Sequence, residues 1–360
     1  MKLCRLLCGA TLVCARLGHA QEANSGFDLR TTLSAAPFYT EQLTQSPRDG
    51  SPVSGAFQAM FYPTWKLSSH WALTGVVQLR SRPNLDRDFS TQGYGAKGDV
   101  LNLSLSYSRI RGTRAVVVRI GKLPSAFGTF YARYDPADNP VTGVPPSYGY
   151  YKPVSFEGVA GAEVEAAWGK LDARAQFANS SPANPRNVWD RDQYGNWAGG
   201  AGYTIRQGFH VGGSVYYGPY LDRKYPFYFP GEANPRDLPA TGYGVDAQWG
   251  RGPWNAWGEW QRFRFDYHAI PVFTEHTGYA ELRRVLTPRW YVATRAGYMR
   301  RSSFPGSQTY ELGAGFRPNR SQILKATYTI QQGRAYPGTL GNVAAIQWVT
   351  SFRVVSLARD

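Results

Sequence analysis

Hydrophobic and polar residues alternate with a period of two along most of this chain. In the clearest segment, 101–108, an apolar set alternates with a polar one: Leu101, Leu103, Leu105 and Tyr107 against Asn102, Ser104, Ser106 and Ser108. Successive side chains of a β-strand point to opposite faces, so this pattern predicts a strand with one apolar and one polar face. The same alternation recurs at 116–120, 173–177, 243–249, 324–330 and 346–353.

Sixteen segments carry this alternation, and most have the roughly 9–11 residues that a tilted strand needs to cross a membrane. No apolar run reaches the roughly 18 residues of a membrane-spanning helix. The predicted strands are 27–36, 55–65, 70–81, 98–109, 114–123, 155–168, 171–180, 196–206, 209–218, 241–249, 254–267, 275–285, 289–300, 307–317, 321–331 and 342–355.

The connections between these strands alternate between short and long. The short ones are 66–69, 110–113, 169–170, 207–208, 250–253, 286–288 and 318–320. The longer ones are 37–54, 82–97, 124–154, 181–195, 219–240, 268–274, 301–306 and 332–341. Short turns at one rim and long loops at the other are typical of outer-membrane barrels. The chain is therefore predicted to be all-β: a transmembrane, antiparallel, up-and-down β-barrel of about sixteen strands.

Residues 1–20 have the pattern of a signal peptide. Lys2 and Arg5 precede a short apolar run, and the small residues Gly18 and Ala20 occupy the positions that a signal peptidase reads. We expect cleavage after Ala20, so that 21–360 forms one barrel domain in the outer membrane of a Gram-negative bacterium. The removed segment would take every cysteine of the chain with it, and with them any disulfide or thiolate site: Cys4, Cys8 and Cys14.

Composition agrees with a membrane barrel better than with a soluble domain. Aromatic residues make up 15% of the chain and charged residues only 18%, against roughly 25% charged in typical domains. Aromatic side chains can form girdles at the membrane interfaces or a ladder that conducts sugars. The girdle is favoured because several tryptophans fall at strand ends beside short turns: Trp71, Trp168, Trp249, Trp254 and Trp290.

The formal net charge is +15, and removal of Lys2, Arg5 and Arg16 with the signal segment lowers it to +12. Because the signal peptide directs the chain out of the cytoplasm, we expect these positive charges to bind membrane lipids and small anionic solutes, not nucleic acid. Most of the excess is arginine, whose planar guanidinium binds phosphate and carboxylate.

The segment Arg119–Pro140, RIGKLPSAFGTFYARYDPADNP, resembles the region in which bacterial outer-membrane porins pass from the fifth strand into their third loop. Its Arg-x-Gly-Lys start, followed by Pro-x-x-Phe-Gly, is similar to porins of the phosphate-selective type and to general porins. The resemblance implies a passive channel and a homotrimer. The final residues, 356–360, depart from the aromatic ending of many such barrels.

The resemblance also implies that the longest connection, 124–154, folds into the lumen and constricts it. A loop of this length in a compact β-protein is expected to have a function. Its polar tip would carry Arg133, Asp135 and Asp138. The alternative is a surface loop packed over the mouth of the barrel.

Strand parity predicts which cations face the lumen. Four arginines on neighbouring strands of the closed barrel would lie opposite the acidic loop residues: Arg30, Arg80, Arg119 and Arg353. Further positive charge on the polar face comes from Arg174, Arg295 and Lys325. These cations would favour anions. The alternative is a weakly charged wall in which lumen carboxylates pair with them: Glu163, Glu165, Asp172, Asp246, Glu259, Glu281 and Glu311.

We predict a passive channel for small hydrophilic solutes, with a bias to anions. Only 21–26 precede the first predicted strand, which favours an open pore over a plugged transporter. No cofactor, metal or catalytic motif is recognisable around the remaining histidines, so an enzyme is not expected. The other hypotheses are an adhesive or structural barrel with a blocked lumen, a barrel enzyme acting on lipid, and a soluble secreted β-sandwich.

Overall fold

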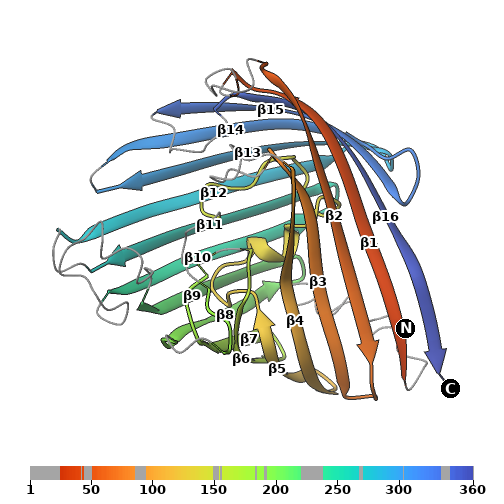
Figure 1. Ribbon diagram of the computed structural model, residues 1–360, viewed down its shortest axis with the longest axis vertical. Helices are drawn as coiled ribbons and strands as arrows, with labels where there is room; N and C mark the ends of the chain where they lie inside the picture. The colour runs from red at the N-terminus through yellow and green to blue at the C-terminus, as the bar shows by residue number, and fades with distance from the viewer. Residues whose placement is uncertain are drawn as a thin grey trace.

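The computed structural model describes residues 25–41, 43, 51–85, 95–148, 154, 156–182, 185–189, 193–219, 238–266, 271–302, 304–333 and 341–359. The expected signal segment lies outside them. Sixteen strands in these residues form one closed antiparallel barrel (Figure 1). None of the helices found in these residues is long and apolar enough to cross a membrane.

All sixteen predicted strands are confirmed, with ends that shift by a few residues. They are β1 (Ser25–Tyr39), β2 (Val53–Lys66), β3 (Trp71–Arg82), β4 (Gly95–Arg111), β5 (Arg114–Leu123), β6 (Val159–Trp168), β7 (Leu171–Ala178), β8 (Asn196–Arg206), β9 (Phe209–Pro219), β10 (Pro239–Arg251), β11 (Trp254–Phe265), β12 (Phe273–Val285), β13 (Trp290–Arg301), β14 (Phe304–Phe316), β15 (Gln322–Gly333) and β16 (Val343–Arg359).

Each strand pairs with the next along the chain, and β1 pairs with β16 to close the wall. Ser25 lies opposite Arg359 in this last pair, so both described ends lie at the rim that carries the short turns. Figure 1 shows these two ends side by side. The alternative of a soluble secreted β-sandwich is therefore excluded, because every strand has two hydrogen-bonded neighbours in one closed sheet.

One predicted long connection is wrong. The segment 301–306 was expected to be a loop, but β13 continues to Arg301 and β14 begins at Phe304, so that two residues join them. A register shift between Met299 and Arg301 accompanies this tight hairpin.

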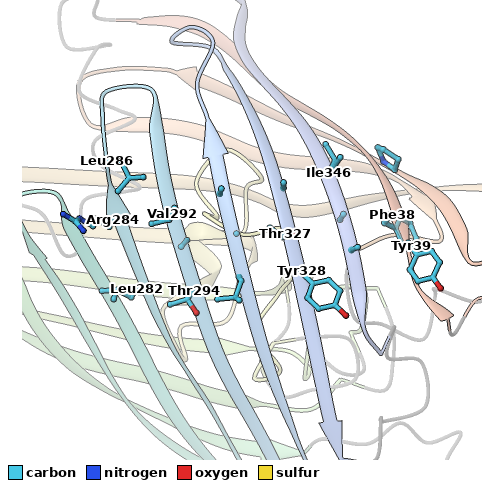
Figure 2. Close-up of a pocket in the computed structure, with 18 of the residues that line it drawn as sticks. Phe38, Tyr39, Leu282, Arg284, Leu286, Val292, Thr294, Thr327, Tyr328 and Ile346 are labelled. Carbon is cyan, nitrogen blue, oxygen red and sulfur yellow. The ribbon is translucent and has the colours of Figure 1, made fainter.

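The apolar sides of the strands form the outer surface of the barrel. Leu103, Ile120 and Val164 are exposed there, whereas the alternating polar residues Gln78 and Glu163 point inward and are buried. The outer surface is hollowed in places. One furrow, of about 960 Å³, crosses β11–β16 and reaches β1 and the start of β2. Figure 2 shows residues that line it, largely apolar ones such as Leu282, Val292 and Ile346.

The predicted apolar row 101–107 is interrupted at its first residue. Asn102 lies opposite Val76, but the next pair is Val77 with Val100, so Leu101 is left in a bulge. A bulge inserts one unpaired residue and re-aims the side chains around it. Leu101 therefore turns inward and is buried, and Val100 takes the exposed outward position. The expectation that Leu101 lies on the outer face is corrected.

Tryptophans beside the short turns lie on the outer surface, as a girdle requires. Trp71, Trp168 and Trp290 are all exposed there, and the Arg114 guanidinium lies 4.7 Å from the Trp168 ring centroid. Among the tryptophans on described strands, Trp257 has inward parity, and its ring is covered by Arg133 at 4.4 Å. The tryptophans at these strand ends therefore have the orientation that a girdle requires.

Candidate functional site

The connection that follows β5 enters the barrel instead of covering its mouth. Residues 124–148 are almost all half-buried or buried, and their side chains and backbone bond to inward-facing residues of strands on opposite sides of the wall. Figure 1 shows this segment, in yellow, within the ring of strands. It includes one short 3-10 helix, η3 (Phe130–Arg133).

The first part of the loop is held against β7 and β9. The amide of Gln176 on β7 accepts a bond from the Ala126 N–H at 2.9 Å and donates one to the Pro124 carbonyl at 2.7 Å. Arg174, two residues earlier, donates to the Gly128 carbonyl at 2.6 Å, and the Gly128 N–H donates to the Ser214 hydroxyl on β9 at 3.2 Å. These bonds satisfy backbone groups that would otherwise be buried without partners.

The end of the described loop is tied to β11 through Tyr148. Its hydroxyl donates to both oxygens of Glu259 at 2.8 Å and accepts from the Thr129 N–H at 2.9 Å. Burial, followed by the negative charge of Glu259, raises the pKa of the Tyr148 hydroxyl well above its usual range. The hydroxyl therefore stays protonated at neutral pH and keeps donating to the carboxylate.

A buried ion network fixes the middle of the loop to β12 and β13. Glu281 on β12 accepts bonds from Arg133 of the loop and from Arg295 on β13, and all three side chains are nearly or completely buried. Arg295 also donates to the Gly143 carbonyl at 2.7 Å and to the Asn139 amide at 2.6 Å. The Glu281 carboxylate thus binds two guanidinium groups. One belongs to the loop itself, and the other, on β13, bonds to a later part of the loop.

The far part of the loop reaches β1, β2, β3 and β15. Asp135 accepts bonds from Thr32 on β1, at 2.9 Å, and from Tyr62 on β2. Gln78 on β3 donates to the Tyr134 hydroxyl at 2.8 Å. The Lys325 ammonium on β15 donates to the carbonyls of Pro136 and Asn139. The loop therefore crosses the interior from one side of the barrel to the other.

Aromatic packing completes the attachment. The rings of Tyr134 and Phe156 stack with centroids 3.8 Å apart, and Phe130 packs edge-on against Tyr279 of β12 at 5.8 Å. Phe127 and the bulged Leu101 belong to the same buried cluster. Burial of this much apolar surface stabilises the loop in a single position.

Several residues predicted to line a pore lie beneath the loop. Arg295 and Lys325 have the expected inward parity, but both are 0% exposed because loop carbonyls cover them. Arg133 and Asp135, expected at a polar tip, are buried anchors. Asp138 is half-buried, and its N–H donates to the Asp135 carbonyl at 2.9 Å. Arg80, on β3, is also buried.

The other predicted arginines face the interior in company with carboxylates. Arg119 on β5 contacts Glu163 at 2.5 Å and Glu165 at 2.8 Å, both on β6. Arg30 and Arg353 share Asp28, at 3.1 and 2.8 Å. Arg295 also contacts Glu311 on β14 at 3.4 Å. The structure therefore supports the pairing alternative for Arg119 and Arg295, whose partners are among the acidic residues named from parity.

Sequence reasoning did not single out Gln78, Gln176, Tyr62 and Asn139, which anchor the loop. The strand residues among them have inward parity, so their orientation was predictable. Their bonds to the loop depend on how the loop folds, and no local pattern specifies that.

A serine–histidine contact in the described residues gives no support to hydrolysis. Ser69 Oγ lies 2.7 Å from His70 Nδ1 in the exposed turn between β2 and β3. Inside the barrel, His210 pairs with Asp172 at 2.8 Å, but no serine bonds to this pair among the described residues. A nucleophile, a base and an orienting acid are thus not brought together there.

A closed sixteen-stranded barrel with its third long connection folded inside is the fold of outer-membrane porins. The structure is similar to OmpF of Salmonella typhi, solved with daunomycin (TM-score 0.62, 11% identity, covering 91% of this chain and 97% of that one). It is also similar to an anion-selective porin from Comamonas acidovorans (0.60, 10%, 91% and 99%). A third similar structure is OmpT of Vibrio cholerae in its trimer form (0.56, 10%, 92% and 99%).

At this level of identity the likeness shows the fold. No protein-family model matches the sequence, and no curated protein matches it.

Proposed function

We propose that this protein is a passive channel for small hydrophilic solutes in the outer membrane of a Gram-negative bacterium. The observation that carries the proposal is the anchored loop: 124–148 is fixed across the lumen by the wall itself. Such a loop narrows a wide barrel while staying in a fixed position, as a pore for passive diffusion requires. The porin fold of the similar structures supports the same reading.

We place the solute path along β5 and β6, next to the part of β4 where Leu101 packs against the loop. The polar anchors of the loop described above fall on β1–β3, β7, β9, β11–β13 and β15, on either side of this arc. Arg119, Glu163 and Glu165 form its charged lining. Tyr131 of η3 lies close enough to Glu163 for the carboxylate charge, after burial, to raise the pKa of its hydroxyl. The constriction would lie between η3 and this part of the wall.

We further propose a bias to anions. Two arginines, Arg30 and Arg353, share the single carboxylate of Asp28 and remain partly exposed, which leaves excess positive charge at the seam between β1 and β16. Arg174 bonds to a neutral carbonyl. Arg119 opposes this bias, because it faces two carboxylates. The resemblance of 119–140 to phosphate-selective porins makes inorganic phosphate the first polyatomic anion to test.

Planar-bilayer recording of the purified protein tests both claims. We expect ohmic conductance, and a reversal potential in a KCl gradient that indicates preference for chloride. The variant R30Q/R353Q should lower the chloride preference, whereas R289Q/R320Q, in exposed short turns, should change it much less. A barrel without conductance would contradict the channel and favour a structural role. Unchanged selectivity in R30Q/R353Q would contradict the charge assignment.

We also propose that copies associate as homotrimers, the form in which the similar Vibrio cholerae protein was solved. Light scattering of the detergent-solubilised protein, corrected for bound detergent, would distinguish a trimer from a monomer.

A further inference from the structure

Three basic side chains stand in one row on the outer surface near the rim of the long loops. Arg262 of β11 lies opposite His276 of β12, and His276 lies opposite Arg300 of β13. Neighbouring strands are about 4.8 Å apart, so the row spans about 10 Å. All three residues have outward parity, because the alternate residues Gln261, Thr277 and Arg295 are buried inside.

A hydrogen bond orients one arginine of the row, and the row as a whole carries net positive charge. Arg262 donates to the Tyr243 hydroxyl of β10 at 2.7 Å, and its guanidinium lies 5.7 Å from that ring centroid. The nearby carboxylates are used elsewhere: Glu275 faces inward and bonds to Arg301, and Asp266 pairs with Arg264 at 2.8 Å. Among the described residues, no carboxylate forms an ion pair with Arg262 or Arg300.

An apolar furrow adjoins this row on its membrane side. It has a volume of about 650 Å³ and crosses β10–β14. Small residues line it, including Gly258, Ala280 and Ala296. Two acidic residues also belong to its lining, Asp246 and Glu259, but both have inward parity and are buried. Two large rings, Trp260 and Tyr298, lie at its end toward the row, each two residues from an arginine of the row, and Tyr310 of β14 lies opposite Ala296. The Trp260 and His276 rings lie 6.0 Å apart, so the furrow and the cations are continuous.

The combination points to one kind of occupant. Arginine binds phosphate through charge-assisted, bidentate hydrogen bonds. An apolar furrow next to that site, on a surface that faces hydrocarbon, fits an acyl chain. Long loops mark the extracellular rim of such barrels, so the row would lie at headgroup level in the outer leaflet.

We propose that the outward face of β10–β14 binds one lipid with an anionic phosphate headgroup. The phosphate would contact Arg262, His276 and Arg300, and one acyl chain would lie in the furrow. The larger furrow of Figure 2 differs in its charge: its labelled cation, Arg284, sits toward the short-turn end, where its guanidinium lies 4.9 Å from the Trp254 ring.

Native mass spectrometry of the detergent-solubilised protein tests the proposal. With dimyristoyl-phosphatidylglycerol as the probe, we expect one retained lipid per barrel, bound at least tenfold more tightly than the zwitterionic dimyristoyl-phosphatidylcholine. R262Q/R300Q should lower the phosphatidylglycerol affinity at least tenfold. R289Q/R320Q removes the same charge from the short turns and should leave it unchanged.

A second pair of variants tests the acyl chain. A280L/A296L fills the furrow with side chains that are themselves compatible with lipid, and should weaken binding. A314L/A326L makes the same change in the furrow of Figure 2 and should not. Inorganic phosphate should fail to displace the lipid.

Equal loss in R262Q/R300Q and R289Q/R320Q, equal affinity for the two lipids, or displacement by inorganic phosphate would each overturn the proposal. So would unchanged binding in A280L/A296L. Heat-modifiability on gels confirms that each variant is a folded barrel. The proposal does not depend on conductance, so a failed channel assay would leave it standing.

Discussion

At the scale of single residues, Glu281 shows how the chain uses charge inside the barrel. Its carboxylate contacts two guanidinium groups, those of Arg133 and Arg295. A buried pair contributes little compared with apolar packing, but removal of one partner leaves an uncompensated buried charge. The Glu281 carboxylate therefore determines the position of the loop more than it determines the stability of the barrel wall.

We expect Glu281→Gln to destabilise the loop by about 3–5 kcal/mol, the usual cost of breaking a buried ion pair. Urea unfolding in lipid vesicles, followed by tryptophan fluorescence, measures the loss. Open-channel current noise should rise as the loop moves. Glu165→Gln is the matched control: Glu165 is one-third exposed beside Arg119, and its loss should cost less than about 1 kcal/mol. Similar effects in the two variants would refute the special role of Glu281.

At the scale of the strand, the bulge in β4 couples the wall to the loop. Leu101 leaves the outer row and joins Phe127 and Phe130 in the buried cluster. One inserted residue thus places an apolar side chain in the lumen without altering the outward row on either side. The bulge is a structural adaptation that lets the loop pack against a wall otherwise lined with serine and asparagine.

Single cysteines can test this orientation, because residues 25–359 contain none. Leu101→Cys should be protected from maleimide in folded protein, whereas Val100→Cys and Leu103→Cys should react with a membrane-permeant maleimide. Leu101→Ala should cost about 2–5 kcal/mol through the cavity that it leaves. If Leu101→Cys reacts as fast as Leu103→Cys, the bulge is misplaced.

The sixteen strands were predictable because period-two alternation is a local signal that repeats in every hairpin. The inward parity of Arg119, Arg295 and Lys325 was predictable for the same reason. Three features were not: the bulge at Leu101, the tight turn between Arg301 and Phe304, and the burial of Arg295. Each depends on packing between segments far apart in the chain, which no short window of sequence records.

At the scale of the whole molecule, the wall and the loop have separate roles. The wall is closed by its own hydrogen bonds, and in the proposed channel the loop would set the free cross-section. Replacement of 126–147 by a short Gly-Ser linker should therefore leave a folded barrel and raise single-channel conductance severalfold. Bilayer recording and heat-modifiability on gels measure the two effects. Unchanged conductance in a folded variant would mean that the loop does not limit the path.

The seam between β1 and β16 has a consequence for how the protein forms. Every other neighbouring pair is joined by a connection, so it can form as soon as its two strands exist. The seam pairs Ser25 with Arg359, and contacts this distant in sequence form slowly. Until the last strand is made, β1 presents an unpaired edge, which is a template for wrong partners. Closure must therefore follow synthesis, and protection of that edge becomes a task for whatever carries the chain to the membrane.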